Sequence, residues 1–423
     1  MLQAGGTALA AGMASPLLAA CGSSPKQASG PTTLTVMSWE IFQTGEWPAW
    51  KKVTQDFEKA HPNIKVKWVG WPFANYDQEV IEQAASGAVS ADVVQCPPEL
   101  ASTLIQVYDM VDPIGDIAQS VGLTPNPQHS QFEKGGKLYA LGVLEVAAAL
   151  QYSKALVGPS GPPTTIQEWL TLSQQITKPP QTYANDLINT VAAGADWWNQ
   201  LQNWTLAYDG VWAKGKTLKI NSSENVKGMQ LWLDLLHASG VAGSSEAAIG
   251  KLWTDNQVGM LMSVMLGGLA SMKINSPQLF PHLSTAAPPW PSRKAISRLH
   301  PAVIVSASKN KAAAQELVKW WIEPKNLWYV LQQNGYPVAP YSNFSEKVPQ
   351  YKAFVDSLPW ATGFRETHFV GEYDILGDYV ANYAQIGDII TRNLEFAISG
   401  GRTIQECMNE AQQEAESTLK VPK

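Results

Sequence analysis

Cysteine is scarce in this chain, because its 423 residues include only Cys21, Cys96 and Cys407. Cys96 and Cys407 lie far apart in the sequence and do not by themselves indicate a disulfide. A structural zinc site would need more closely spaced sulfur and nitrogen ligands than these residues and the scattered histidines provide. We therefore expect neither a bound metal nor any other cofactor.

Charge is also low, and neither sign dominates any region. Charged residues make up 16% of the chain, and the formal net charge is −6 with acidic and basic residues interspersed. A nucleic-acid partner would need a basic stripe for its phosphates, and the sequence offers none. The HExxH, GxSxG and CxxC patterns are absent, and the carboxylates form no obvious close catalytic pair. The sequence therefore favours neither a nucleic-acid-binding protein nor an enzyme.

Long apolar runs are confined to the amino terminus. Residues 2–20 are small, apolar and uncharged, and they end directly before Cys21, a pattern typical of a signal peptide. Leu18-Ala19-Ala20-Cys21 resembles a bacterial lipobox, in which the cysteine is acylated. We expect residues 1–20 to be the signal peptide and 21–32 to hold the lipidated Cys21 and a flexible tether. This would anchor the exported protein to the outer face of the bacterial cytoplasmic membrane.

The same segment lacks the positive charge with which signal peptides begin, since no Lys or Arg precedes Lys26. Leu2–Gly6 look like the stretch that follows the paired arginines of a twin-arginine signal, so we expect a start further upstream. A buried or membrane-spanning helix is the alternative, which the shortness of the run and its Gly and Ala content disfavour.

Tryptophan, in contrast, is abundant, with 17 residues against 13 tyrosines and 10 phenylalanines. Its flat apolar face and its N–H suit stacking on a sugar ring as well as core packing. We expect most tryptophans to pack in a core and a minority to contact a ligand. The chain is also longer than one hydrophobic core supports, which predicts two domains of roughly 150–200 residues each.

The residues after the tether alternate between strand and helix patterns. Thr33–Ser38, Ile64–Val69 and Ala91–Gln95 predict strands, while Trp47–His61 and Tyr76–Ser86 have helical spacing. Such alternation predicts an α/β fold with a mostly parallel sheet flanked by helices. In sheets of this kind, ligands bind at the carboxyl ends of the strands.

Short motifs in a fixed order carry a resemblance that covers nearly all of the mature chain. Phe57–Val66 resembles the helix-to-second-strand passage of the maltose-binding-protein-like family of extracellular solute-binding proteins from ABC importers. Ala85–Val94, Gly136–Lys154 and Pro162–Leu170 are similar to its asG…PDVv, GKlYglP…lyYNk and PkTWdEl elements. The later members of the series are Ile220–Val226, Asn256–Met260, Ser308–Ala314, Gly335–Val338 and Ser399–Thr403. Departures are Gly142 for the usual proline, Ser153 for asparagine and the lack of a glycine pair before Val303.

The resemblance implies a two-lobed periplasmic-binding-protein type II fold, in which two α/β lobes are joined by three hinge crossings. It further implies a monomeric lipoprotein that closes on a small carbohydrate or polyol and delivers it to the membrane subunits of an ABC importer. We place the crossings near Glu145, near Pro301 and within 335–340. Lobe one is then 33–145 plus 300–340, and lobe two is 146–299 plus 341–423.

Candidate ligand contacts follow from strand ends and from the resemblance. Trp39 and Glu40 follow the first strand, and Gln95 and Cys96 end the third. Glu145 lies in an otherwise apolar crossing, where a buried carboxylate needs either a structural partner or a ligand, and both readings stay open. The resemblance adds the stretch 197–210, the turn 262–268 and three late positions for which a core or surface role is an equal alternative. The predicted contacts are Trp39, Glu40, Gln95, Cys96, Glu145, Trp197, Trp198, Gln200, Gly267, Trp290, Trp360 and Arg365.

Two further features set limits on these expectations. Two adjacent tryptophans on a helix cannot share one face, so at least one of Trp197 and Trp198 should pack in the core. Residues 210–217 satisfy the spacing of a phosphate-binding loop, but a helix-like segment precedes them and a strand-like one follows, which predicts a hairpin instead.

Two other functions share much of this evidence. A secreted carbohydrate-active enzyme would also have a tryptophan-rich cleft with carboxylates. A sensor-type binding protein for a membrane kinase would have the same fold and a different partner. The sequence leaves the identity of the sugar or polyol open.

Overall fold

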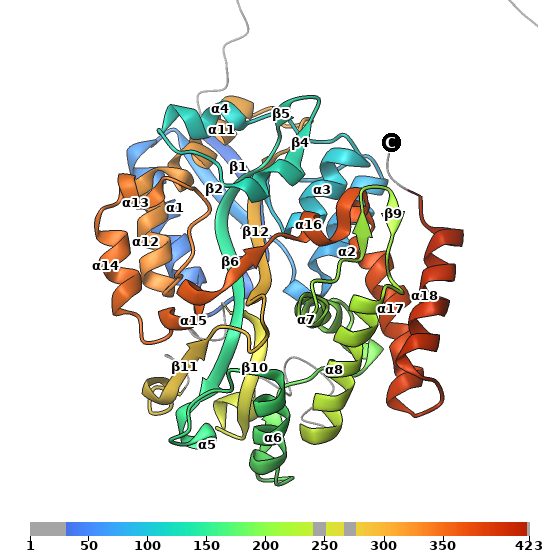
Figure 1. Cartoon of the computed structure of the whole chain (residues 1–423). Coiled ribbons are helices and arrows are strands. Elements are labelled where there is room, and N and C mark those ends of the chain that lie inside the picture. The colour runs from blue at the N-terminus through green and yellow to red at the C-terminus, as the bar shows by residue number, and fades with distance from the viewer. Residues whose placement is uncertain (1–30, 240–250, 266–275, 421–423) are drawn as a thin grey trace, which may run out of the picture.

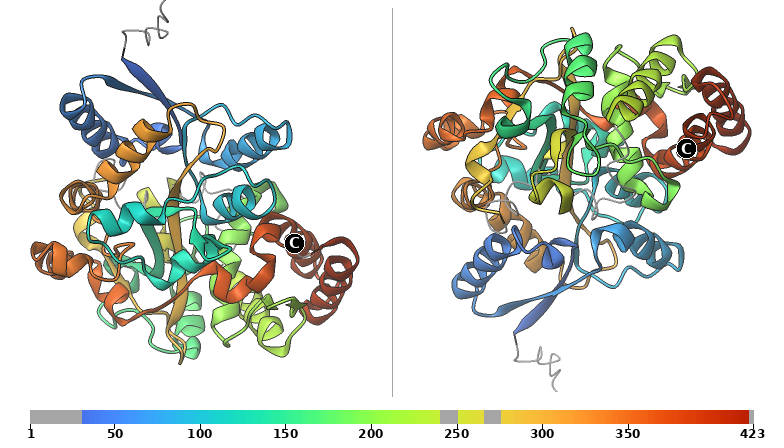
Figure 2. Two further views of the ribbon diagram at one scale, coloured as in Figure 1. Left: turned by 90° about the horizontal axis from the view of Figure 1, so that it is seen from above. Right: turned by 90° about the horizontal axis from the view of Figure 1, so that it is seen from below.

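The computed structural model describes residues 31–239, 251–265 and 276–420, so the predictions for Cys21 and Gly267 lie outside the described residues. Within these residues, nine strands form one sheet with the order β2-β1-β3-β12-β6-β10-β7, with β11 paired to β6 and β13 paired to β12. The predicted α/β architecture is confirmed, and helices cover both sides of the sheet (Figures 1 and 2).

The first part of the chain forms strands and helices close to their predicted positions. Alternating β-branched residues form β1 (Thr32–Met37) and β2 (Ile64–Val69), which pair in parallel, and β1 also pairs in parallel with β3 (Val93–Gln95). Helix α1 (Trp47–Ala60) has Pro48 in its first turn, where a missing N–H costs nothing. Also in this part are η1 (Glu40–Phe42), α2 (Phe73–Ala85), α3 (Pro98–Gln106), α4 (Gly115–Ser120), η2 (Pro127–Phe132), β4 (Glu133–Lys134) and β5 (Lys137–Leu138).

The two longest strands are β6 (Leu141–Ser153) and β12 (Lys294–Ile304), which pair antiparallel and extend along most of the molecule (Figure 1). They break the parallel pattern of the sheet because they run through both lobes. Leu144 and Ala302 pack in one core cluster together with Val36, whereas Ala148 and Ile296 pack in another. Both strands therefore pass from one hydrophobic core to the other.

The passage between the cores lies where Leu299 pairs with Glu145 and Arg298 pairs with Val146. The ladder is irregular between His300 and Pro301, because proline has no N–H to donate. The predicted lobe boundaries at 145 and 300 fall within these strands. Residues Phe344 and Val348 pack in the cluster of lobe one, beyond the boundary proposed at 340.

The core of lobe two is built mainly from tryptophan and aliphatic side chains between helices and the strands β7 (Tyr183–Asn185), β10 (Val258–Met265) and β11 (Leu283–Ala286). Helices α17 (Tyr383–Ile398) and α18 (Ile404–Thr418) form the outer edge in both views of Figure 2. Also in this part are α5 (Lys154–Val157), α6 (Ile166–Ile176), η3 (Val191–Ala193), α7 (Ala195–Leu206), β8 (Ala213–Lys214), β9 (Thr217–Leu218), α8 (Ser223–Ser239) and η4 (Phe280–His282).

The carboxyl-terminal half contributes elements to both lobes. Helix α12 (Pro324–Asn334) ends at Gly335, whose φ of +71° is the left-handed conformation that glycine adopts most readily. The remaining elements are α11 (Lys311–Ile322), α13 (Phe344–Lys347), α14 (Gln350–Ser357), α15 (Ala361–Glu366), β13 (His368–Val370), α16 (Glu372–Leu376) and η5 (Gly377–Asn382).

The segment with the spacing of a phosphate-binding loop is a hairpin, as predicted. Strands β8 and β9 pair antiparallel across Gly215 and Lys216, with Ala213 opposite Leu218. No helix follows the loop directly, so its backbone N–H groups do not converge with a helix terminus on a phosphate.

We predict that Gly228→Ala destabilises lobe two. Gly228 lies on α8, and a Cβ at this position would stand 2.3 Å from the carbonyl oxygen of Trp204 on α7, so the two helices would have to separate. We expect the free energy of unfolding to fall by about 2 kcal/mol, as measured by urea denaturation. Gly401→Ala is the control, because its Cβ would meet no atom closer than 3.5 Å. Equal stability of the two variants would contradict close packing of α7 on α8.

Candidate ligand-binding site at the lobe boundary

A single guanidinium organises the polar groups at the lobe boundary. Arg298 lies on β12 with its side chain 3% exposed, and its Nη2 donates to both carboxylate oxygens of Glu99 at 2.7 Å. Its Nε lies 3.1 Å from Oε1 of Glu372, and its Nη1 donates to the hydroxyl of Tyr383 at 3.1 Å and to Asn199. We name this group, together with Asp77, the Arg298 cluster.

The members of the Arg298 cluster come from both lobes. Glu99 lies in the first turn of α3, directly after β3, and Asp77 lies near the start of α2, directly after β2. From lobe two, Glu372 begins α16 and Tyr383 begins α17. Helices α3, α7 and α16 all contact β12, and α3 also contacts η5, as Figure 1 shows beside the long strand. The carboxyl ends of two parallel strands thus meet lobe two around Arg298.

Burial and charge shift the ionisation of the cluster. Burial opposes the charge of Arg298, but the carboxylates of Glu372 and Glu99 outweigh it and raise the pKa of the guanidinium. Burial raises the pKa of Glu372 well above its usual value, although the charge of Arg298 acts in the opposite direction. Burial and the charge of Glu99 likewise raise the pKa of Asp77. These two carboxyls therefore resist ionisation in the closed arrangement.

Several buried polar atoms of this region lack a hydrogen-bond partner among the described residues. They are Oδ1 of Asp77, Nε2 of Gln95 and Oε2 of Glu372, whereas Nε of Arg298 and Oε1 of Glu372 face each other as the ion pair described above. Asp77 as a residue is partly exposed, but its Oδ1 is buried. An unsatisfied buried polar group costs about 1–3 kcal/mol, so a bound molecule that supplies the missing partners would be favoured here.

Aromatic rings flank the cluster in lobe one. Trp39, which is 3% exposed, meets Tyr76 and His300 edge to face at centroid distances of 5.3 and 5.2 Å. The Tyr76 hydroxyl donates to the carbonyl oxygen of Gln95 at 2.7 Å. Burial and the charge of Arg298 lower the pKa of His300 to about 3, so this ring is neutral at physiological pH. Trp39 and Gln95 are therefore both held by Tyr76, which directly precedes Asp77 of the cluster.

Glu145 lies beside this surface and has structural partners. Its carboxylate accepts from Asn126 Nδ2 at 2.8 Å, from Gln128 Nε2 at 2.7 Å and from the Ser297 hydroxyl at 2.5 Å. Ser297 directly precedes Arg298, so Glu145 ties the η2 segment to the strand that carries the cluster. Burial raises the pKa of Glu145 to about 7, and the three hydrogen bonds act against the increase.

Known proteins share the sequence profile and the fold of this chain. Residues 44–327 match the sequence profile of the bacterial extracellular solute-binding protein family. The chain belongs to this family.

Solved structures with the same fold cover almost the whole solute-binding protein. The GacH receptor of Streptomyces glaucescens, solved unliganded and with acarbose, has a TM-score of 0.79 at 17% identity and matches 93% of this chain and 100% of its own. An ABC transporter solute-binding protein of Thermotoga lettingae, bound to α-D-tagatose, has a TM-score of 0.78 at 18% identity over 91% and 99%. UgpB of Mycobacterium tuberculosis, with glycerophosphocholine, has a TM-score of 0.74 at 16% identity over 92% and 98%.

The structure of the solute-binding protein places the predicted residues of α7 in different surroundings. Trp198 contacts Tyr383 of the cluster at 5.6 Å and Trp212 at 5.1 Å between ring centroids, whereas Trp197 packs on Trp232 inside the core. Gln200 uses its amide to hold the backbone after β7, since it donates to the carbonyl of Asp186 and accepts from the N–H of Ile188. Of these three residues, Trp198 alone borders the Arg298 cluster.

Other predicted contacts lie away from the cluster. Glu40 is buried with Glu46 near Tyr336, and burial and the charge of Glu46 raise its pKa well above the usual value. Trp290 packs with Trp169 and Trp204 in the core of lobe two. In the described part of the chain, neither residue forms a hydrogen bond or an ion pair with Arg298, and their role in ligand binding stays a prediction.

Of the remaining predicted residues, one lies beside the strand of the cluster and two lie elsewhere. The backbone N–H of Cys96 donates to the carbonyl oxygen of Pro301 at 3.0 Å, which places it beside the strand of the cluster. Trp360 packs on Phe280, and Arg365 forms an exposed ion pair of 2.6 Å with Asp356. Arg365 also lines a cavity of about 250 Å³ beside Tyr341 and Phe364.

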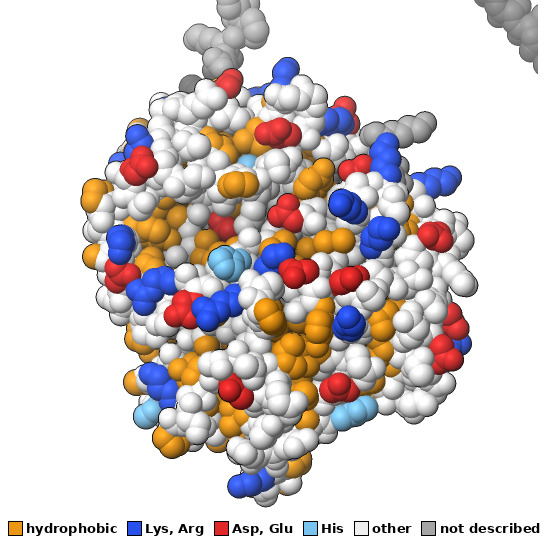
Figure 3. All heavy atoms as spheres, in the orientation of Figure 1, with side chains coloured by type: hydrophobic (Ala, Val, Ile, Leu, Met, Phe, Trp, Pro, Cys, Tyr) orange, Lys and Arg blue, Asp and Glu red, His pale blue; other side chains and the backbone are white. Residues whose placement is uncertain are grey.

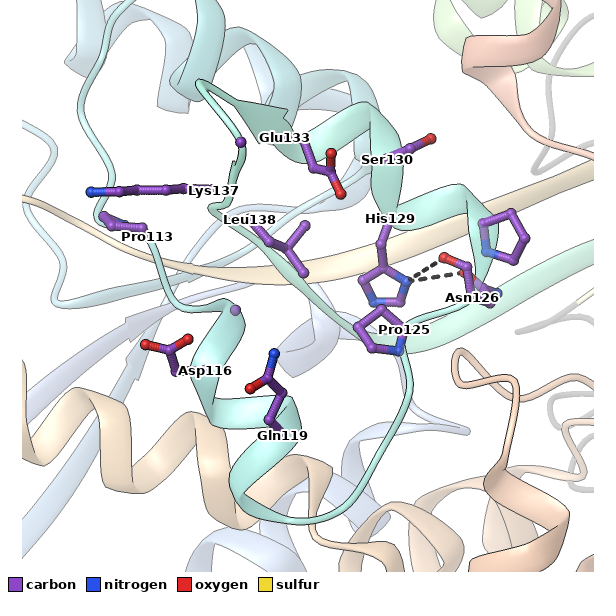
Figure 4. Close-up of a pocket in the computed structure, with 13 residues that line it drawn as sticks. Pro113, Asp116, Gln119, Pro125, Asn126, His129, Ser130, Glu133, Lys137 and Leu138 are labelled. Carbon is purple, nitrogen blue, oxygen red and sulfur yellow. Dashed lines mark hydrogen bonds between the residues drawn. The ribbon is translucent and has the colours of Figure 1, made fainter.

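A larger cavity of about 670 Å³ lies in lobe one and includes no residue of the Arg298 cluster (Figure 4). His129 and Asn126 line it, and the His129 Nδ1 lies 3.0 Å from the side-chain oxygen of Asn126. Burial lowers the pKa of His129 to about 3, so the ring is neutral and its Nε2 accepts from the Gly142 N–H. These polar groups are occupied within the protein.

Sequence reasoning missed the centre of the site. Arg298 is the one charged residue within the apolar stretch from Ala295 to Val305, the same signal that identified Glu145 in the other long strand. Glu99 follows the strand Ala91–Gln95 and could have been found by its place at a carboxyl end. Glu372 and Tyr383 carry no comparable signal, because only the fold brings them to β12.

Within the described residues, no group of His, Cys, Asp or Glu side chains has the arrangement of a metal site. None of the described helices combines the length and the apolarity that crossing a membrane requires. Acidic and basic side chains are interspersed on the face of the molecule that Figure 3 shows.

We predict that Glu145→Gln flattens part of the pH dependence of stability. Because folding raises the pKa of Glu145 from 4.5 to about 7, its neutral form is favoured in the folded protein. This stabilisation is complete below pH 4.5 and is lost as the pH rises through 7.

The measurement is urea denaturation of both proteins at pH 5 and pH 8. The free energy of unfolding of the wild type should fall relative to Glu145→Gln by about 3 kcal/mol over this interval. Glu316→Gln on the exposed face of α11 is the control. Its free energy of unfolding should differ from that of the wild type by the same amount at both pH values. If the difference in free energy of unfolding between the wild type and Glu145→Gln were also the same at pH 5 and pH 8, folding would not raise the pKa of Glu145.

Proposed function

We propose that this solute-binding protein captures a small carbohydrate or polyol between its lobes, at the Arg298 cluster, and delivers it to an ABC import permease. The observation that carries the proposal is the convergence of unsatisfied donors and acceptors from both lobes beside Trp39 and Trp198. A polyhydroxylated molecule supplies donors and acceptors together with apolar C–H faces. GacH and the Thermotoga lettingae protein are described with the carbohydrates acarbose and tagatose, which supports this ligand class.

Entry of a ligand requires the lobes to separate, because the Arg298 cluster is buried between them. Opening would expose Arg298 and its partners to water, and a ligand would then replace that water as the lobes close. A ligand that contacts both lobes stabilises the closed form by its difference in affinity for the two forms. We propose that the permease recognises this closed, loaded form.

We further propose that the protein is exported and anchored by lipid at Cys21. The family of extracellular solute-binding proteins supports export, and the lipobox-like residues before Cys21 support acylation. Hinge crossings at 145, 300 and 340 and a monomeric state complete the proposal.

The first test is a panel of neutral sugars and polyols with the purified mature chain. A true ligand should raise the melting temperature by several degrees at a hundredfold excess over Kd, since this adds about 2.7 kcal/mol of stability. It should also change tryptophan fluorescence, because Trp39 and Trp198 flank the site. The ligand should be recovered unchanged after hours of incubation. Release of a hydrolysis product would instead identify a carbohydrate-active enzyme.

We predict that Glu99→Gln weakens binding of the ligand found in this panel by about tenfold or more. The substitution removes a charged acceptor that faces lobe two, and charge-assisted hydrogen bonds contribute about 1.5–3 kcal/mol. Calorimetric titration measures the affinity, and circular dichroism checks that the variant is folded. Glu316→Gln removes a carboxylate from an exposed position and should bind like the wild type. Unchanged affinity in Glu99→Gln would place the ligand elsewhere.

We predict that Cys21→Ala releases the protein from the membrane. Without the thiol, no acyl chain can be attached, so the protein should move from the membrane fraction to the soluble exported fraction. Metabolic labelling with a radioactive fatty acid should mark the wild type and leave the variant unlabelled. Labelling of Cys21→Ala would contradict anchoring at this position.

A further inference from the structure

Charge is unbalanced at the Arg298 cluster, because three carboxyl groups face one guanidinium. Both oxygens of Glu99 accept from Nη2 of Arg298, whereas Glu372 has a single ion-pair contact of 3.1 Å from its Oε1 to Nε of Arg298. Oδ1 of Asp77 has no hydrogen-bond donor among the described residues. None of the lysine ion pairs in the described part of the chain reaches these carboxyl groups; the lysine nearest along β12, Lys294, pairs with Asp209. The neighbouring ring of His300 is neutral at physiological pH, since its pKa is lowered to about 3.

The carboxyl groups in excess over Arg298 lie at the lobe boundary. Glu372 is 1% exposed; its Oε1 lies 3.1 Å from Nε of Arg298, and its Oε2 has no hydrogen-bond donor within the described residues. Oδ1 of Asp77 is buried without a donor as well. One of these groups belongs to lobe two and the other to lobe one. A bound molecule therefore meets unsatisfied acceptors on both sides of the site.

Two kinds of ligand group could satisfy these acceptors. A hydroxyl donates one hydrogen bond and leaves the charge of the site unchanged. An ammonium group donates three and also brings a positive charge, which would favour ionisation of the carboxyl groups whose pKa burial raises. A carboxylate or phosphate on the ligand would instead be repelled by every unpaired acceptor of the site.

We infer that the ligand of this protein carries an amino group, as in an amino sugar or an amine-bearing polyol, and that Glu372 and Asp77 bind its ammonium. Glu99 stays with Arg298 and holds the remaining hydroxyls in place. The inference rests on the proposed function, because it concerns the ligand of the same site.

The test compares one carbon skeleton in three charge states. The neutral sugar that gives the largest thermal shift is titrated by calorimetry at pH 7 against its amino derivative and its uronic acid. Glucosamine, glucose and glucuronate form one such set. We expect the amino form to bind at least tenfold more tightly than the neutral form, and the acid at least tenfold more weakly. Glycerophosphocholine, which carries both charges, is titrated alongside and should bind more weakly than the amino form.

Two variants connect this preference to the carboxyl groups. Glu372→Gln and Asp77→Asn keep the shape of each side chain and remove its charge, so each should reduce the preference for the amino form to within about threefold of the neutral one. The affinity of each variant for the neutral sugar is measured as the reference for this ratio. Glu316→Gln removes an equal charge from the surface and should retain the full preference. If one variant does not fold, the other carries this comparison, and the series on the wild type stands by itself.

The outcomes separate the two proposals. Absence of binding for every sugar and polyol would overturn the proposed function itself. Binding of neutral sugars with an equal or weaker amino form, or tightest binding of the acid, would overturn only the inference about charge. A preference that survives in both variants would show that other groups recognise the amine.

Discussion

Burial of Arg298 in the middle of a strand that passes through both lobes is the constraint on which the rest of the site depends. A guanidinium at 3% exposure is tolerated only with compensating charges and acceptors around it. No neighbour on β12 supplies a carboxylate, so they come from α3 in one lobe and α16 in the other. One desolvated charge therefore determines where the two lobes meet.

The same arrangement explains how a buried guanidinium is accommodated between the lobes. The two carboxylate oxygens of Glu99 and the hydroxyl of Tyr383 satisfy much of the guanidinium. Removing one partner of such a network leaves an uncompensated buried charge, which costs more than the pair contributes. Oε2 of Glu372 and Oδ1 of Asp77 have no hydrogen-bond donor among the described residues, so the network around Arg298 is incomplete. A ligand that donates to these oxygens would complete it.

Glu145 and Arg298 are charged residues that lie near each other in the paired long strands β6 and β12. Both are single charged residues in long apolar strands, and they lie near each other because Leu299 pairs with Glu145 in the ladder. Their environments differ. Neutral hydrogen-bond donors surround Glu145, whereas the carboxyl groups of Glu99 and Glu372 surround Arg298. Ser297 connects the two, because it donates to Glu145 and directly precedes Arg298 on β12.

The sequence alone determined the local elements and the family. Periodicity located the first strands and helices, flanking residues identified the hairpin at 213–218, and ordered motifs indicated the solute-binding fold. It also predicted candidate site residues directly at strand ends, such as Trp39 and Gln95. Tertiary structure decided the rest, because Glu99, Arg298, Glu372 and Tyr383 are separated by up to 284 positions and meet only when both lobes pack on β12. Local periodicity carries no information about which distant carboxylate compensates a buried charge, since that depends on how the two cores are placed against each other.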